Sequence, residues 1–479
     1  MASIKEKIGY ALGDAAAGGI TWKIMSIAFP FYFTNVFGLT FADTALLMLI
    51  ARMFDVVTDP LMGSIADRTK SRWGTYRPWL IFGAIPYGLI FAGLLFTPDF
   101  GPTANRIYAY TLYLLMMAVY TLVNVPYGSL LGVMTEDSDE RNQFSSYRMV
   151  GAYAMGFLVL FAFPYIQNLI GGHEYVALND QLKHLKEANA DAASLKEIEQ
   201  ALVPFNRHIY AVIGVMFGIL GAALTMACGL MTRERVQIRR AEKFSFRQYG
   251  QLFTNKPWVY ITLTAVCTNF FNGFRYAVAS YMFTYCLGGD ITISKLIINF
   301  TVFMAIGEAI CMIFGGLSPA FTRMVGSKRM SFVWASVICC ASSVVYFFIP
   351  MQASYIWVLI AVSVVTSIGC GLYSPLLWSM YADVADYATE KNGTSSTGLI
   401  FSSGTMAQKF GGAISGSLIA MLLGMAGLVS ETNEATGETV VTITDLESVK
   451  TMVWALFSLF PAVIALVMGM LVYKFPLKK

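Results

Sequence analysis

Residues 52–60 read RMFDVVTDP within an otherwise apolar stretch, and this short sequence decides how the chain folds. The spacing of Arg52, Asp55 and Asp59 at i, i+3 and i+7 places their side chains on one face of a helix. The surrounding residues 41–66 are long enough to cross roughly 30 Å of hydrocarbon. An ionisable side chain costs about 2.5 to 3.5 kcal/mol at the centre of a membrane helix, so the three must face the interior of a helical bundle. The sequence therefore predicts a helical membrane protein with a functional polar centre.

The composition supports a protein that lies within a bilayer. Of 479 residues, 56% are hydrophobic and only 13% are charged, and the mean hydropathy is +0.60. The basic residues gather in short loops, so the net charge of +4 does not indicate nucleic-acid binding. The seven cysteines fall in apolar segments without zinc-ligand spacing, and we expect free, packed thiols. No Ser/His/Asp, HExxH or phosphate-loop pattern is present, so we expect neither an enzyme nor a cofactor.

Charged, polar and Gly/Pro-rich breaks divide the chain into twelve candidate spans. These cover residues 8–36, 41–66, 78–97, 105–134, 147–170, 207–231, 257–287, 293–321, 332–351, 354–387, 398–428 and 449–474. Lys and Arg are more frequent on the side of both termini, which places the termini in the cytoplasm. The longest basic connection, 232–256, separates a bundle at 1–231 from a bundle at 257–479. The polar segment 171–206 predicts short amphipathic helices forming an extracytoplasmic, solvated cap.

The two acids of the second span indicate a cation site. They lie about one turn apart, and hydroxyls nearby would complete an all-oxygen cage suited to a hard cation or to binding a proton. The candidate cation-binding residues are Asp55, Asp59, Thr58 and Thr121. The alternative is an ion-pair network with Arg52 and Lys409 that only locks the two halves together.

Polar and aromatic side chains within the spans are candidates for substrate binding. Lys409 lies among small residues that let helices approach closely, and it needs a carboxylate or an anionic substrate group there. Aromatic rings can stack on the apolar face of a sugar. The candidates are Trp22, Lys23, Tyr120, Asn124, Tyr127, Arg148, Tyr373, Trp378 and Lys409. The alternative for Arg148, at the start of a span, is snorkelling to the interface. Asp14, Arg275 and Glu308 are further buried polar residues, and Asp14 and Glu308 are equally well explained as structural pairs.

The sequence resembles a known family at several motifs. At residues 55–63 (DVVTDPLMG), 67–69 (DRT) and 72–78 (RWGTYRP), it resembles the glycoside-pentoside-hexuronide:cation symporters. The match continues at residues 124–127 (NVPY), 140–141 (ER), 148 (R), 382–387 (ADVADY) and 409–412 (KFGG). It spans nearly the whole chain.

The resemblance implies an all-α membrane protein with the major facilitator fold, twelve transmembrane helices in two six-helix bundles. It also implies a cation site at Asp55, Asp59 and Thr121, with Lys409 beside it. Thr58 stands where sodium-coupled members carry Asn, so the choice among Na⁺, Li⁺ and H⁺ is open, and we expect Na⁺ in preference to H⁺. The expected coupling or gating residues are Arg52, Asp67, Arg68, Arg77, Arg141, Asp383 and Asp386.

Galactoside specificity should not be transferred to this chain. Three positions near the galactoside in those members differ here, two by loss of an acid and one by loss of a Trp. They are Gly18 or Gly19, Asn124 and Gly128. With Lys23, Arg148 and Lys409 available, the site's balance shifts toward positive charge, which makes an acidic sugar such as a uronide a serious option.

These observations predict cation-coupled symport of a sugar, glycoside or uronide by alternating access, in a bacterial inner membrane. We expect a small-molecule substrate and the lipid bilayer as partners, no nucleic acid, and function as a monomer. The alternatives are a passive sugar facilitator, a lipid or lysolipid symporter, and a membrane sensor built on a transporter scaffold.

Overall fold

The computed structural model describes residues 2–187, 192–236, 247–289, 291–293, 296–392, 396–432 and 439–477. Its first half contains α1 (Ile4–Asp14), η1 (Ala15–Trp22), α2 (Lys23–Ile27), α3 (Phe29–Phe31), η2 (Tyr32–Val36), α4 (Phe41–Arg68), α5 (Arg77–Leu94), α6 (Pro102–Met134), α7 (Ser138–Glu187) and α8 (Ala192–Met231). Its second half begins with α9 (Arg247–Thr254), α10 (Lys256–Tyr281), η3 (Met282–Cys286), β1 (Ile291–Ile293), β2 (Leu296–Ile298), α11 (Phe300–Val325) and α12 (Lys328–Phe347). It continues with η4 (Ala353–Tyr355), α13 (Ile356–Asn392), α14 (Thr397–Met425), β3 (Leu428–Thr432), β4 (Thr439–Ile443), α15 (Leu446–Phe457) and α16 (Leu459–Tyr473).

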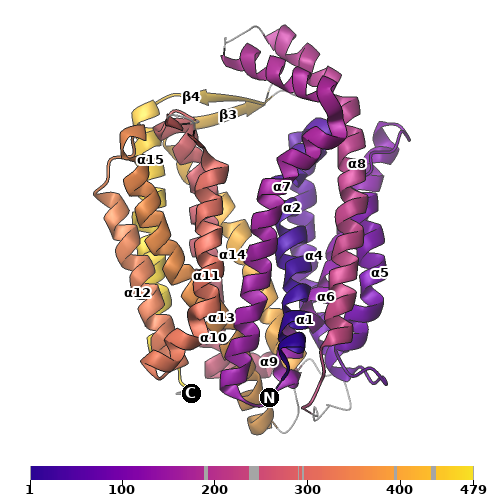
Figure 1. Ribbon diagram of the computed structural model, residues 1–479, viewed down its shortest axis with the longest axis vertical. Helices are drawn as coiled ribbons and strands as arrows, with labels where there is room; N and C mark the ends of the chain where they lie inside the picture. The colour runs from indigo at the N-terminus through magenta and orange to yellow at the C-terminus, as the bar shows by residue number, and fades with distance from the viewer. Residues whose placement is uncertain are drawn as a thin grey trace.

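The helices form two upright bundles (Figure 1). The segments α1 to α8 make one bundle and α10 to α16 the other, and both termini lie at the same end, which we call the terminal end. Each bundle has its own apolar core. A third apolar cluster, which includes Tyr127 and Tyr373, draws residues from both bundles. Across the middle, α4 packs on α14, and α7 packs on α11 and α13.

Nine helical stretches in the described residues are long and apolar enough to cross a membrane by length and composition. The three remaining predicted spans correspond to the segments from α1 to η2, to α4, and to α10 with η3. The first span is divided into short pieces by the π-helical segments η1 and η2. Helix α4 carries Arg52, Asp55 and Asp59, and α10 carries Asn269 and Asn272. The first span is therefore missing from the nine because its helical pieces are short, and α4 and α10 both carry polar side chains.

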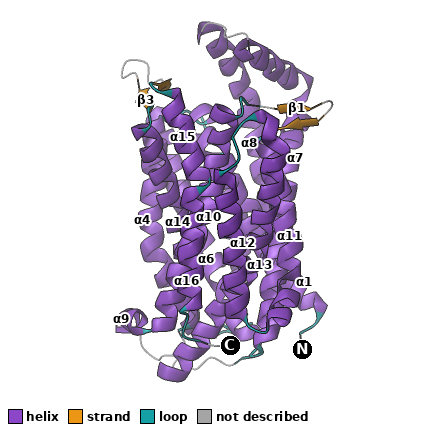
Figure 2. Ribbon diagram, turned by 90° about the vertical axis from the view of Figure 1, so that its left-hand side faces the viewer, coloured by secondary structure: helices purple, strands orange, loops and turns teal. Residues whose placement is uncertain are grey.

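The end opposite the termini carries the extramembrane structure. Helix α7 kinks at Gly172, where φ is 71°, and continues to Glu187. With the start of α8 it forms a helical projection above the bundles (Figure 1). The segment 171–206 is thus helical as predicted, but its helices are continuations of two spans; residues 188–191 lie outside the described residues. Two hairpins, β1–β2 and β3–β4, lie at the same end (Figure 2).

The predicted linker 232–256 is described only at its two ends, because residues 237–246 lie outside the described residues. At its start, the Glu234 carboxylate accepts the backbone N–H groups of Thr75, Tyr76 and Arg77 at 2.7, 2.8 and 3.0 Å. This fastens the linker to the loop before α5. The bundle boundaries at 231 and 257 stay a prediction.

Two glycines let the bundles approach closely near the terminal end. A Cβ added at Gly63 of α4 would lie 2.5 Å from the carbonyl oxygen of Gly398 in α14. That separation is too short for any side chain, so glycine is required for this crossing of the two helices.

We expect Gly63→Ala to destabilise the folded chain by about 1 to 3 kcal/mol, because the added methyl group forces α4 and α14 apart. Thermal unfolding of the detergent-purified protein measures this. Gly416→Ala, on α14 with no atom within 4 Å of the new Cβ, is the control and should not lower stability. Equal melting temperatures for Gly63→Ala and the unmodified chain would contradict the close approach.

Candidate functional site

The centre of the molecule holds a charged cluster built from three helices. Helix α4 contributes Asp55 and Asp59, α6 contributes Thr121, and α14 contributes Lys409 and Thr405. The two acids lie on one face of α4, as the i, i+4 spacing requires. Because α4 and α6 belong to the first bundle and α14 to the second, this cluster spans the boundary between the bundles.

Lys409 lies between the two acids. Its Nζ is 2.8 Å from Oδ1 of Asp55 and 2.8 Å from Oδ1 of Asp59. It also donates to Oγ1 of Thr121 at 3.2 Å, and Thr121 in turn donates to Oδ1 of Asp59 at 2.7 Å. The acid side chains are 1% and 0% exposed and that of Lys409 is 4% exposed. The ammonium group is thus almost shielded from solvent in a cage of oxygen atoms from Asp55, Asp59 and Thr121.

The contacts within this cage are unequal. Asp59 receives aligned hydrogen bonds from Lys409 and Thr121, and Thr405 donates to its second oxygen at 3.4 Å. Oδ1 of Asp55 is close to the ammonium, but among the described residues no donor is aligned with it. Asp55 is therefore held mainly by charge, and one of its oxygens keeps the capacity to bind a further cation.

Two other residues predicted near the acids have different surroundings. The hydroxyl of Thr58 donates to the carbonyl oxygen of Phe54, one turn earlier, at 3.1 Å. It therefore serves its own helix, and the structure does not bring it into the cage. Nη1 of Arg52 lies 3.4 Å from Oδ2 of Asp55, and the guanidinium stands over the ring of Trp22, 5.6 Å from its centroid. Arg52 thus flanks the cage on the side of the first span.

A second charged pair lies between α1 and α7. Nε of Arg148 donates to Oδ2 of Asp14 at 2.8 Å. The guanidinium lies 4.8 Å from the ring centroid of Tyr127 and 4.0 Å from that of Trp378. Arg148 is only 2% exposed, so the alternative that it snorkels to the interface is wrong. The carboxylate and the two aromatic faces compensate its charge inside the protein.

The predicted loss of an acid from the first span is offset by a neighbour. A Cβ at Gly18 would lie 3.0 Å from Oδ1 of Asp14, so the carboxylate from one turn earlier reaches this position. At Gly19 a Cβ would lie 2.5 Å from Cβ of Met155, so this glycine permits close packing on α7. In the sequence, Asp14 could be recognised as a candidate only because it is a charged residue within an apolar span.

A third pair joins the two bundles directly. Nζ of Lys23 in the first span forms an ion pair with Oε1 of Glu308 on α11, and the hydroxyl of Tyr276 donates to the same oxygen. Nζ also lies 4.8 Å from the ring centroid of Tyr276. Lys23, Arg148 and Lys409 each have a carboxylate partner, so these three cations are not available as the sequence argument assumed.

The remaining substrate candidates fall into two groups. Tyr120 lies beside the cage, with its ring centroid 5.8 Å from Nζ of Lys409. Asn124 is buried on the same helix. Gly128 faces Phe401 of the second bundle, with 3.5 Å to an added Cβ. Tyr373 belongs to the apolar cluster shared by the two bundles, where its ring stacks on Phe332 of α12.

Several predicted gating residues connect the bundles nearer the terminal end. Arg141 of α7 forms an ion pair with Asp386 and lies 3.6 Å from Asp383, both on α13. Asp383 also pairs with Lys328 at 2.8 Å. Oδ1 of Asp67 accepts the backbone N–H of Gly398 at 2.7 Å. The contacts of Arg141 and Asp67 hold the two bundles together, whereas the pair of Lys328 with Asp383 lies within the second bundle.

Arg68 and Arg77 both donate to backbone carbonyl oxygens of the first bundle. Arg68 donates to the carbonyl oxygen of Ser64 at 2.6 Å, and Nε of Arg77 donates to that of Gly229 at 2.8 Å.

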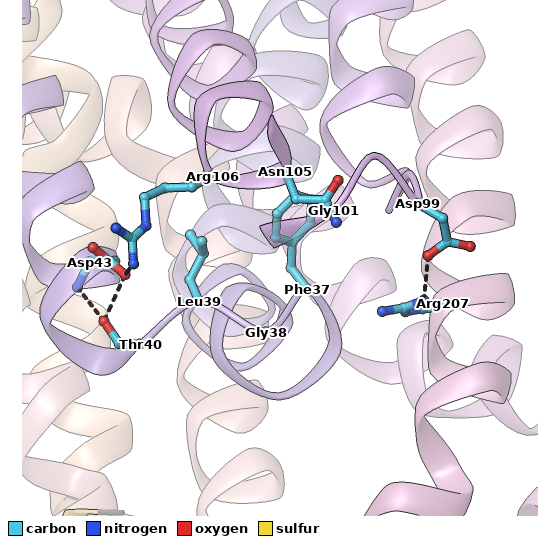
Figure 3. Close-up of a pocket in the computed structure, with 10 residues that line it drawn as sticks. All are labelled: Phe37, Gly38, Leu39, Thr40, Asp43, Asp99, Gly101, Asn105, Arg106 and Arg207. Atoms are coloured by element: carbon cyan, nitrogen blue, oxygen red, sulfur yellow. Dashed lines mark hydrogen bonds and ion pairs between the residues drawn. The ribbon is translucent and has the colours of Figure 1, made fainter. Parts of the chain in front are cut away.

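A surface pocket of about 480 Å³ lies at the opposite end of the first bundle (Figure 3). Two ion pairs border it, Arg106 with Asp43 at 2.8 Å and Arg207 with Asp99 at 3.1 Å. None of the residues that line it belongs to the charged cluster between the bundles. The pocket is thus separate from the predicted site.

Comparison with known proteins identifies the family. Residues 9–479 match the family described as MFS/sugar transport protein. The chain belongs to this family. It is 30% identical over 461 residues to the inner membrane symporter YicJ of Escherichia coli, covering 96% of this chain and 89% of YicJ. It is 26% identical over 426 residues to the glucuronide carrier protein homolog of the same organism, covering 88% and 84%.

Solved structures agree with the fold. The fucose:proton symporter FucP of E. coli aligns with a TM-score of 0.61 at 14% identity, covering 99% of this chain and 98% of FucP. The major facilitator fold and the membership among sugar and glycoside symporters predicted from the sequence are confirmed. This transporter therefore carries its charged cluster at the boundary of two bundles that such proteins move against each other.

We expect Arg148→Met to destabilise this transporter by about 3 to 5 kcal/mol, because it leaves the Asp14 carboxylate buried without its partner. The double variant Asp14→Asn/Arg148→Met removes both charges and should recover part of that loss. Thermal unfolding in detergent measures all three proteins. A double variant no more stable than Arg148→Met would show that the pair is not coupled.

Proposed function

We propose that this transporter couples the movement of a sugar or glycoside to that of a cation by alternating access between its two bundles. The observation that carries the proposal is the seat of Lys409. An ammonium group lies 2.8 Å from each of two carboxylates and 3.2 Å from a hydroxyl. Two carboxylates and a hydroxyl also provide suitable ligands for a monovalent metal ion, and one of the carboxylates could instead bind a proton.

The arrangement suggests how binding of a cation alters the bundles. The carboxylates belong to the first bundle and the ammonium to the second, so their attraction holds α4 against α14. A cation that binds Asp55 and Asp59 competes with Lys409 for the same oxygens and weakens this link. A ligand shifts a conformational equilibrium only through such a difference in its interaction with the two states. The competition is therefore the physical basis of coupling.

The coupling ion in this proposal is Na⁺, with H⁺ as the alternative. Two carboxylates and a hydroxyl provide only oxygen ligands, which a hard cation prefers. Protonation of one carboxylate would also weaken its attraction for Lys409, as Na⁺ binding would. Uptake measured under an imposed gradient of each ion therefore has to distinguish Na⁺ from H⁺. In this proposal the ion is itself transported in each cycle.

The terminal end faces the cytoplasm of a bacterial inner membrane in this proposal, since Lys and Arg are enriched in the loops there. The ion pairs of Arg141 with Asp383 and Asp386 then close the cytoplasmic side. The name of the relative YicJ supports the inner membrane. The solute is a sugar, glycoside or uronide, supported by relatives named for glucuronide and isoprimeverose. We also propose that the functional unit is a monomer.

Uptake into proteoliposomes tests the proposal. A panel of labelled neutral glycosides and uronides is offered with an inward Na⁺ gradient, an inward proton gradient, or neither. Accumulation above equilibrium under one gradient is the expected result. Equilibration that ignores both gradients would make the protein a passive facilitator and contradict coupling.

We expect Asp59→Asn to abolish stimulation by the coupling ion, which should amount to about 5- to 150-fold in the unmodified protein. The amide removes the negative charge that attracts both Lys409 and the ion. Thr58→Ala is the matched control on the same helix, because the Thr58 hydroxyl bonds its own backbone, and it should keep the stimulation. Full stimulation in Asp59→Asn would exclude this acid from the cation site.

We expect Lys409→Gln to bind the coupling ion more tightly, by about tenfold, because removing an ion-pairing competitor leaves the carboxylates free for the ion. The stimulation of sugar uptake by that ion should fall at the same time. Ion binding to the purified protein and sugar uptake are measured separately. Weaker ion binding in Lys409→Gln would show that the ammonium supports the ion site.

A further inference from the structure

Arg275 on α10 carries a positive charge, and among the described residues no carboxylate lies close enough to form an ion pair with it. Its Nη1 donates to Sγ of Cys370 at 3.0 Å, and its Nη2 donates to Oγ of Ser367 at 3.1 Å. A thiol and a hydroxyl satisfy the hydrogen bonds of a guanidinium, but neither neutralises it. The side chain is half-buried within a spanning helix.

The neighbouring charges are already matched. The other central cations are Lys23, Arg52, Arg148 and Lys409, and the carboxylates that pair with them are Asp14, Asp55, Asp59 and Glu308. Four cations are therefore paired with four carboxylates, and Arg275 is the excess charge in this part of the described structure. A charge without compensation within a membrane is costly. An anion from outside the chain would remove that cost.

Arg275 lies next to contacts between the bundles. The hydroxyl of the following residue, Tyr276, bonds Glu308, and Glu308 pairs with Lys23 of the other bundle. An anion that reaches Arg275 would therefore lie close to the surfaces that separate when the bundles move.

Both residues that Arg275 contacts lie on α13, which also packs on α7 of the first bundle. One turn after Cys370, Oγ of Ser374 is 2.9 Å from the hydroxyl of Tyr153 on α7. The guanidinium thus lies between α10 and a helix at the bundle boundary. In transporters of this kind the solute site lies at the interface between the two halves, so Arg275 is placed near that interface.

We propose that Arg275 binds a carboxylate of the transported solute, so that the preferred solute is an acidic sugar. This proposal rests on the sugar transport proposed above. The planar guanidinium fork matches a carboxylate with two parallel hydrogen bonds, an arrangement that lysine cannot reproduce. Cys370 and Ser367 hold the fork in place until the solute arrives.

An alternative source of the missing negative charge is Cys370 itself, if its thiol is deprotonated beside the guanidinium. The two accounts predict different behaviour. A thiolate counter-ion makes Cys370 as important as Arg275, whereas a solute carboxylate makes Arg275 important and Cys370 replaceable by another neutral acceptor. Cys370→Ser therefore separates the two.

The test compares two solutes that differ in one group, a labelled aryl glucuronide and the aryl glucoside with the same aglycone. Equilibrium binding to the detergent-purified protein and uptake into proteoliposomes are both measured. The variants are Arg275→Gln, Arg275→Lys and Cys370→Ser. Arg323→Gln, an exposed arginine at the terminal end of α11, is the matched control.

We expect the unmodified protein to prefer the glucuronide. Arg275→Gln should weaken glucuronide binding by about tenfold or more and leave glucoside binding unchanged, because only the carboxylate loses its partner. Arg275→Lys should lie between the two, since it keeps the charge without the paired hydrogen bonds. If Arg275→Gln does not fold, Arg275→Lys alone supplies the comparison. Cys370→Ser and Arg323→Gln should resemble the unmodified protein.

Several outcomes would overturn the assignment. They are a preference for the glucoside in the unmodified protein, an equal loss for both sugars in Arg275→Gln, and a Cys370→Ser variant that behaves as Arg275→Gln does. Each leaves sugar transport intact if either sugar accumulates under an ion gradient. Conversely, glucuronide binding that depends on Arg275 without uptake of either sugar would support the assignment and refute the proposed transport.

Discussion

The attraction between Lys409 and the two acids of α4 is the interaction on which the rest of this structure depends. In a medium of low dielectric constant, a charge that loses its partner is far more costly than it is in water. Asp55 and Asp59 therefore require a cation close by, and Lys409 supplies it from the opposite bundle. The need for a cation beside these two carboxylates thus favours the contact between α4 and α14.

The same constraint organises the other charged groups. Asp14 neutralises Arg148 within the first bundle, Glu308 neutralises Lys23 across the boundary, and Asp386 pairs with Arg141 nearer the terminal end. Each cross-bundle ion pair holds the bundles together only while no other ion or charged solute binds one of its two partners more strongly. Ions and anionic solutes that enter the centre act on these pairs, which is how a small ligand can alter the packing of two large bundles.

The fold and the location of the site could be predicted from the sequence to a large degree. The apolar runs gave the number of spans, and the i, i+3, i+7 spacing placed Arg52, Asp55 and Asp59 on one face. The surroundings of individual side chains could not be predicted in this way. Thr58 has the right chemistry and the right helix for a cation ligand, but its hydroxyl bonds the backbone of its own preceding turn.

By itself, the sequence determined that this is a two-bundle membrane transporter with acids in its centre, because hydrocarbon excludes unpaired charge and rewards long apolar helices. Only the tertiary structure decided which partner each charge has. Lys23, Arg148 and Lys409 were equally available in the sequence, yet each forms an ion pair with a carboxylate, whereas Arg275 forms none with the residues that the structure describes. Pairing depends on distances between helices that are remote in the chain, and no periodicity along one helix contains that information.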